Sequence, residues 1–153
     1  MVAFNSENMI KRYESLKEII DEWFDVRYDT YERRRVVLIK EMEMIITRLY
    51  NKCRFIRENI EKVIDVKNKS KQQIISTLEE RGYDKLTDKN DKTNNDILNY
   101  DYLLNMKIYS LTKEKFEELQ KKLKDIQKKL EDYKKLTTED IWLSELDQLE
   151  KAL

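Results

Sequence analysis

The sequence predicts an all-α protein: a long antiparallel coiled-coil hairpin that carries a small helical head and begins with a short strand. Charged residues make up 41% of the 153 residues and hydrophobic residues 40%, so exposed helices explain the charge better than disorder does. The chain contains 1 Gly and 0 Pro, which leaves long stretches without helix breakers. Apolar residues also recur at steps of three and four in two separate stretches, as they do in paired helices.

The N-terminal residues predict a strand. Residues 1–4 are apolar and are followed by Asn-Ser, which suggests a strand end within residues 1–6. One strand is not stable by itself, so we expect its sheet to lie in sequence outside this chain. That expectation would make the chain a piece of a larger protein.

Residues 7–65 are predicted to form the ascending helix of the coiled coil, because neither Pro nor Gly interrupts them. A helix over residues 13–65 would be roughly 80 Å long, which exceeds the width of a small domain. One of its faces therefore needs a partner helix. Its apolar seam, interrupted once at Arg35, consists of Phe24, Tyr28, Tyr31, Leu38, Met42, Ile45, Leu49, Cys53, Ile56, Ile60 and Val63.

The partner is predicted at residues 112–136, the descending helix. Thr112 is a suitable N-cap for it, and its apolar residues follow a strict heptad pattern. Thr137 and Asp140 have the spacing of a capping box, which predicts one more helix over residues 137–153, at the base of the arm. The heptad residues of the descending helix are Phe116, Leu119, Leu123, Ile126, Leu130 and Tyr133.

The residues between the two arms, 66–111, are predicted to form the head. Ser70 and Gln73 are spaced as a capping box for a short helix that ends near Arg81, with Gly82 as its stop. A polar loop follows over residues 83–96. The next stretch, "YDYLLNMKIY", is unexpectedly apolar for a charged coiled coil, so it needs either a core or a partner to cover it.

The composition excludes several kinds of active site. The chain has no His and one Cys, Cys53, so ordinary zinc spacing is absent and a reducing compartment is the default. One glycine cannot build a phosphate-binding loop. The 31 basic and 31 acidic residues cancel, which argues against a protein whose main task is binding phosphate backbones. No apolar run reaches the ~20 residues of a membrane helix, so we expect no membrane partner.

Several stretches, in order along nearly the whole chain, carry a family resemblance. They are "MVAF" with "IKRYES", "EWFDVRYDTYERRR", "RFIRENI", "LEERGYD", "YDYLLNM", "SLTKEK" and "DIWLSELDQLE". Together they resemble the central arm and C-gate of eukaryotic-type type IIA DNA topoisomerases (topoisomerase II). The resemblance implies that the strand end in residues 1–6 belongs to the DNA-binding core of such an enzyme. The chain departs from the family pattern at residues 85–99, which are shorter than in many members, and at Ile108, where the family often has Trp.

The resemblance implies the function of a parent enzyme. Such an enzyme cuts both strands of one duplex through paired tyrosines, passes a second duplex through the break and religates it, using ATP and Mg²⁺. The resemblance places the tyrosine nucleophile, the metal site and the ATPase in other domains, so we expect no catalytic, cofactor-binding or metal-ligating residue among the nine tyrosines or elsewhere in this chain. The enzyme would act in the nucleus of a eukaryote, or in the host cytoplasm or nucleus if it came from a large DNA virus.

In this family the two heads of a homodimer meet at the C-gate, the last exit for the transported duplex. We expect part of this self-association surface to come from six residues around the apolar stretch. The alternative is that the same residues form the core of the head. The six residues are Tyr83, Tyr100, Leu103, Leu104, Met106 and Ile108.

Two further interpretations concern the rest of the chain. The run at 33–35, "RRR", suggests either contact with DNA or solvated surface, and flanking acidic residues favour the latter. Trp23, Phe24 and Trp142 are expected to pack together at the base of the arm. A structural coiled-coil tether unrelated to topoisomerases would explain the apolar seams equally well, but not the ordered family stretches.

Overall fold

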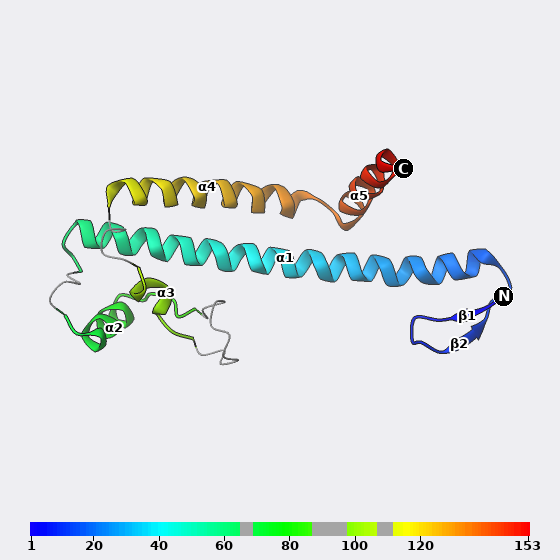
Figure 1. Cartoon of the computed structure of the whole chain (residues 1–153), viewed down its shortest axis with the longest axis horizontal. Coiled ribbons are helices and arrows are strands. Elements are labelled where there is room, and N and C mark those ends of the chain that lie inside the picture. Colours follow the sequence, from blue (N-terminus) through cyan, green and yellow to red (C-terminus); the bar gives the residue numbers. More distant parts are fainter. Residues whose placement is uncertain (65–68, 87–97, 107–111) are drawn as a thin grey trace. The chain divides into compact units, whose positions relative to one another are not determined.

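The computed structural model describes residues 1–64, 69–86, 98–106 and 112–153. The described elements are, in order, the strands β1 (Val2–Phe4) and β2 (Ile10–Arg12) and the helices α1 (Leu16–Ile60), α2 (Lys71–Glu80), α3 (Asp101–Leu104), α4 (Lys113–Lys135) and α5 (Thr138–Ala152) (Figure 1). The prediction of a predominantly helical chain with a strand at its N-terminus is confirmed.

The chain forms two compact units. The terminal unit contains residues 1–41 together with 131–153, and the central unit contains residues 42–130. The helices α1 and α4 each contribute one part to either unit. No helix of the described residues is both long enough and apolar enough to cross a bilayer.

The N-terminal strand has its partner within the chain. β1 pairs antiparallel with β2, in the register Val2 with Arg12 and Phe4 with Ile10 (Figure 1, blue). The expectation of an unpaired strand was therefore wrong, as was the start of a helix at residue 7. The reason is a turn whose first residue, Asn5, accepts backbone N–H groups through its side chain, and in which Asn8 adopts a φ of 60° that Asn tolerates.

The helix α1 begins nine residues later than predicted, because a local cap defines its start. The Ser15 hydroxyl accepts the backbone N–H of Glu18, and the Glu18 carboxylate accepts the backbone N–H of Glu14. At the other end the chain leaves the helix through Lys62, whose φ is 55°. The helix thus spans the 45 residues Leu16–Ile60 rather than the expected range 7–65.

Both predicted capping boxes are confirmed. Ser70 and Gln73 cap α2 reciprocally, and Thr137 and Asp140 do the same for α5. Gly82 follows α2 with a φ of 66°, the left-handed conformation that a glycine stop predicts.

The central unit has a core built around the end of α1. Side chains from α1, α2, α3 and the segments beside them form one buried cluster, and a second cluster joins α1 to α4. In the second cluster Cys53 and Ile56 of α1 pack with Leu119 of α4, so the predicted contact between the two seams exists here. The first cluster contains Phe55, Ile64, Ile74, Leu78, Tyr83, Tyr100, Tyr102 and Leu103.

Leu78→Ala is expected to destabilise the chain by ~3 kcal/mol, because the Leu78 side chain is fully buried and its loss leaves a cavity. The matched control is Leu149→Ala, since the Leu149 side chain is 56% exposed. Urea unfolding followed by circular dichroism measures both variants. Equal destabilisation of the two would contradict the described core.

Candidate interaction surfaces

The six residues expected at a self-association surface occupy different places. Tyr83, Tyr100 and Leu103 are only 4%, 5% and 1% exposed, and all belong to the core of the central unit. They therefore take the alternative left open by the sequence, the core of the head. Leu104 and Met106 are half-buried and lie against that core, while Ile108 lies outside the described residues. The expected surface now depends on Leu104 and Met106.

A buried carboxylate, which the sequence analysis missed, connects three parts of the central unit. The Glu58 carboxylate on α1 accepts hydrogen bonds from Arg54 Nε at 2.9 Å, from Arg81 Nη1 at 3.3 Å and from the Tyr83 hydroxyl at 3.0 Å. Burial is the largest single influence and opposes ionisation, but Arg54, Tyr83 and Arg81 together outweigh it, so the pKa of Glu58 is lowered. Burial, followed by the contact with Glu58, raises the pKa of Tyr83.

A second buried polar group sits on the same helix. The Asn51 side chain is 2% exposed and donates to the Tyr102 hydroxyl at 3.0 Å and to the Asp84 carboxylate at 3.1 Å. The Tyr102 hydroxyl in turn donates to the backbone carbonyl of Asp84 at 2.7 Å. Burial, more than any other influence, raises the pKa of Tyr102 to about 12. The sequence signal was a short amide side chain between the seam residues Leu49 and Cys53, where a charged residue would be usual.

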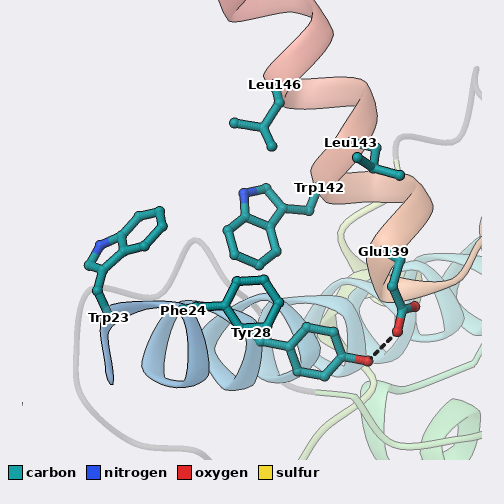
Figure 2. Close-up of a pocket in the computed structure, with 7 residues that line it drawn as sticks. All are labelled: Trp23, Phe24, Tyr28, Glu139, Trp142, Leu143 and Leu146. Atoms are coloured by element: carbon teal, nitrogen blue, oxygen red, sulfur yellow. Dashed lines mark hydrogen bonds between the residues drawn. The ribbon is translucent and has the colours of Figure 1, made fainter. Parts of the chain in front are cut away.

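The terminal unit contains an aromatic cluster (Figure 2). The Trp142 ring of α5 has its centroid 5.1 Å from that of Phe24, 5.4 Å from that of Tyr31 and 5.9 Å from that of Trp23. The expected packing of Trp23, Phe24 and Trp142 is therefore confirmed. Trp142 is buried, but Trp23 and Phe24 remain 53% and 49% exposed, so the cluster is covered on one side only.

Tyrosine hydroxyls of α1 donate hydrogen bonds to carboxylates of α5 in this unit. The Tyr28 hydroxyl donates to the Glu139 carboxylate, and the Tyr31 hydroxyl donates to the Glu145 carboxylate, both at 2.6 Å (Figure 2 draws the first). Each hydroxyl is the main reason that the pKa of its carboxylate partner lies below the ordinary range. The α5 helix is therefore held by polar contacts as well as by Trp142.

The three consecutive arginines each have a partner within the terminal unit. Arg33 pairs with Asp29, and Arg34 pairs with Glu145 at 2.9 Å. Arg35 donates to the backbone carbonyls of Lys134 and Leu136, both at 3.1 Å, where α4 ends. Arg35 thus caps the C-terminus of α4. The two interpretations of "RRR" from the sequence, contact with DNA and solvated surface, did not include this role.

The described residues offer little chemistry for catalysis. Among them, no group of three or more acidic or Cys side chains could hold a metal ion. The Cys53 thiol is buried, and burial raises its pKa, which disfavours the reactive thiolate.

Comparison with known proteins confirms the resemblance seen in the sequence. The family model that describes the A-type subunits of DNA gyrase and topoisomerase IV matches residues 1–147. DNA topoisomerase 2 of Arabidopsis thaliana is 31% identical and aligns with 100% of this chain. DNA topoisomerase 2-beta of Gallus gallus is 33% identical and aligns with 99%. The solved DNA-binding, cleavage and re-ligation domain of Plasmodium falciparum topoisomerase II is 30% identical over 99% of this chain, with a TM-score of 0.82.

The chain corresponds to a small part of each of these relatives. It spans 12% of the Arabidopsis protein, 11% of the Gallus protein and 23% of the solved Plasmodium chain. The structural likeness therefore concerns one region of a much longer polypeptide.

Glu58→Gln is expected to destabilise the chain by about 2 kcal/mol at pH 7, because it removes a buried charge that two arginines and a tyrosine stabilise. Since the folded-state pKa of Glu58 is lowered, its contribution is complete above the unfolded value of about 4.3 and disappears as the pH falls through the folded value. The stability difference between wild type and variant should therefore shrink between about pH 5 and about pH 3.

Urea unfolding at several pH values measures this difference. Glu117→Gln, at an exposed position of α4, serves as the control and should behave as the wild type does. A gap between wild type and Glu58→Gln that stays constant as the pH falls would contradict the ionised network.

Arg35→Ala is expected to cost ~1–2 kcal/mol, because it removes two charge-assisted hydrogen bonds at the end of α4. Arg33→Ala is a matched control: both positions lie inside α1, and the Arg33 side chain is 75% exposed, so we expect a loss under about 0.5 kcal/mol. Thermal unfolding followed by circular dichroism compares them. Equal effects would show that the carbonyl contacts of Arg35 are not stabilising.

Proposed function

Because this chain belongs to the family of DNA gyrase and topoisomerase IV A-type subunits, we propose that it forms the arm and C-gate of a type IIA DNA topoisomerase. In such an enzyme two copies of the head associate as a homodimer. The transported duplex leaves between them after ATP-dependent passage through the cleaved duplex. The match to a topoisomerase II cleavage domain over 99% of the chain supports the proposal.

The observation that carries the proposal is the apolar surface beside the core of the central unit. Leu104 and Met106 pack against the core from its edge and keep part of their surface exposed. Leu98, which the sequence analysis did not single out, is 60% exposed and directly precedes Asn99, whose backbone pairs with Leu86. A two-fold interface brings the same surface of both copies together. Apolar side chains on that surface can therefore pack against apolar side chains of the other copy.

A gate must close firmly and still open. Burial of a few apolar side chains meets both needs, because the free energy gained on closing is modest and is recovered in every cycle. The core behind these side chains, with Leu103 at 1% exposure, gives them a fixed platform. This arrangement suits reversible contact better than a permanent interface.

The charges of the chain suit a wall past which DNA moves. The 31 basic and 31 acidic residues cancel, and Arg33, Arg34 and Arg35 are each engaged within the chain. A surface whose cations are balanced or engaged releases a duplex readily, because the affinity for DNA depends on how many phosphates are neutralised.

In this proposal the chemistry of the enzyme lies outside this chain. The ATP and Mg²⁺ that the family uses would bind in other domains of the parent enzyme. Tyr83, Tyr100 and Tyr102 are buried and hydrogen-bonded, which suits packing and not nucleophilic attack. The enzyme would act in a nucleus, or in the host cytoplasm or nucleus if the source is a large DNA virus.

Leu104→Asp is expected to weaken self-association of the chain by about tenfold or more, because it would bury a carboxylate in the apolar interface between the two copies. Sedimentation equilibrium at concentrations around tens of micromolar measures the effect. Since Leu104 also touches the core, Leu98→Asp provides a second variant at an exposed position, and circular dichroism verifies that both remain helical.

The matched control is Met44→Asp, at a 47% exposed position on α1 of the same unit, which should leave the association unchanged. A wild-type chain that is monomeric at these concentrations would exclude the gate for this chain. A dimer that withstands both Leu98→Asp and Leu104→Asp would show that it uses another surface.

A further inference from the structure

Two adjacent leucines of α3 lie in different environments of the central unit. The Leu103 side chain is 1% exposed and belongs to the core, whereas Leu104 packs against that core from its edge. The two side chains are equally apolar, so the hydrophobic effect, which has no direction, does not choose between them. Successive helical residues point about 100° apart, so rotating α3 by that angle would exchange their places. A directional contact must therefore set the rotation of α3 about its axis.

Helix α3 is too short to set this rotation by itself. It has 4 residues, about one turn, and so short a helix has little stability of its own. The side chain of its N-cap residue, Tyr100, forms no capping hydrogen bond, and its hydroxyl donates instead to the backbone carbonyl of Tyr83 at 3.1 Å. The direction of α3 consequently comes from contacts with other segments of the unit.

Tyr102 connects α3 to the long helix α1. This tyrosine directly precedes Leu103 and is 4% exposed. Its hydroxyl accepts a hydrogen bond from Asn51 Nδ2 at 3.0 Å and donates to the backbone carbonyl of Asp84 at 2.7 Å. The Arg48 guanidinium, also from α1, lies 6.0 Å from the centroid of the same ring. Hydrogen bonds depend on direction, unlike apolar contacts, so these bonds fix where the Tyr102 side chain points.

We propose that Asn51 is a positioning residue: by binding the Tyr102 hydroxyl it sets the rotation of α3, and thereby presents Leu104, together with Met106, for self-association. The inference rests on the function proposed above for that edge of the core. A rotation that buried Leu104 in place of Leu103 would carry the Tyr102 hydroxyl away from the Asn51 amide. Because the Asn51 side chain is 2% exposed, one of its N–H groups would then be buried without an acceptor, which is costly.

Asn51 contributes to the choice of arrangement more than to the stability of the fold. If Asn51 is replaced by the similarly sized Leu, the Tyr102 hydroxyl still donates to the backbone carbonyl of Asp84. Asp84 is exposed, so water can replace the amide as a partner of its carboxylate. The substitution therefore leaves no buried donor unpaired. Buried amides that select one packing among several are known from coiled coils.

Thiol labelling measures the rotation of α3 directly. The Leu103→Cys and Leu104→Cys variants place a thiol at the buried and at the edge position, and the native Cys53 is buried, so it reacts slowly. The Leu104→Cys variant should react with a maleimide about tenfold faster than the Leu103→Cys variant, because a buried thiol reacts only when the structure opens locally. When Asn51→Leu is added to each, the two rates should differ by less than about threefold.

Self-association tests the consequence for the edge. Asn51→Leu should raise the dissociation constant of the dimer by about tenfold in sedimentation equilibrium, while the urea midpoint stays near the wild-type value. Tyr102→Phe, which removes the hydroxyl that Asn51 binds, should also raise it, and the double variant should exceed neither single variant by much. Asn59→Leu is the matched control: its amide, also on α1, donates to the Phe55 carbonyl of the same helix, so association should not change.

Three results would overturn the proposal. A labelling contrast that Asn51→Leu leaves intact would show that α3 keeps its rotation without the amide. An equal loss of association in Asn59→Leu would show that Asn51 has no special place. A urea midpoint that falls in step with association would make Asn51 a stabilising residue only. A monomeric wild-type chain would instead exclude the proposed gate, and the labelling contrast would still decide whether Asn51 sets the rotation of α3.

Discussion

The carboxylate of Glu58 is the contact on which the central unit depends. It lies where α1 nears its end, and it holds Arg54 from the same helix, Arg81 after α2 and the hydroxyl of Tyr83. The backbone carbonyl of Glu58 also accepts the N–H groups of Val63 and Ile64 as the chain leaves α1. A charge this buried is stable only when several donors satisfy it, so the segments that supply them are fixed relative to α1.

The buried side chains of the head follow from that arrangement. With Tyr83 held by Glu58 and Tyr102 by Asn51, the apolar stretch that looked unexplained in a charged coil is divided between two environments. Tyr100 and Leu103 face the core, whereas Leu104 and Met106 remain at its edge. Steric and polar constraints on neighbouring tyrosines thus leave a small apolar surface available for association.

The terminal unit is organised by a different means. Trp142 packs on rings from α1, while Tyr28, Tyr31 and Arg34 bind two carboxylates of α5. These residues were noticed in the sequence as aromatics or charges, but their pairing was not foreseen, because the partners lie far apart along the chain. The strand partner of β1 was missed for the opposite reason: it is local, and its turn is built from asparagine side chains rather than glycine.

The sequence by itself determined the helical class, both capping boxes, the glycine stop after α2 and the seam contact of α1 with α4, because these depend on periodicity and on residues within one turn of each other. Family membership was also evident from stretches distributed along the whole chain. Only the tertiary structure decided which apolar residues of the head are core and how Glu58 and Asn51 are satisfied. Those outcomes depend on contacts between distant segments, and no local pattern encodes which of two equally apolar faces will find a partner.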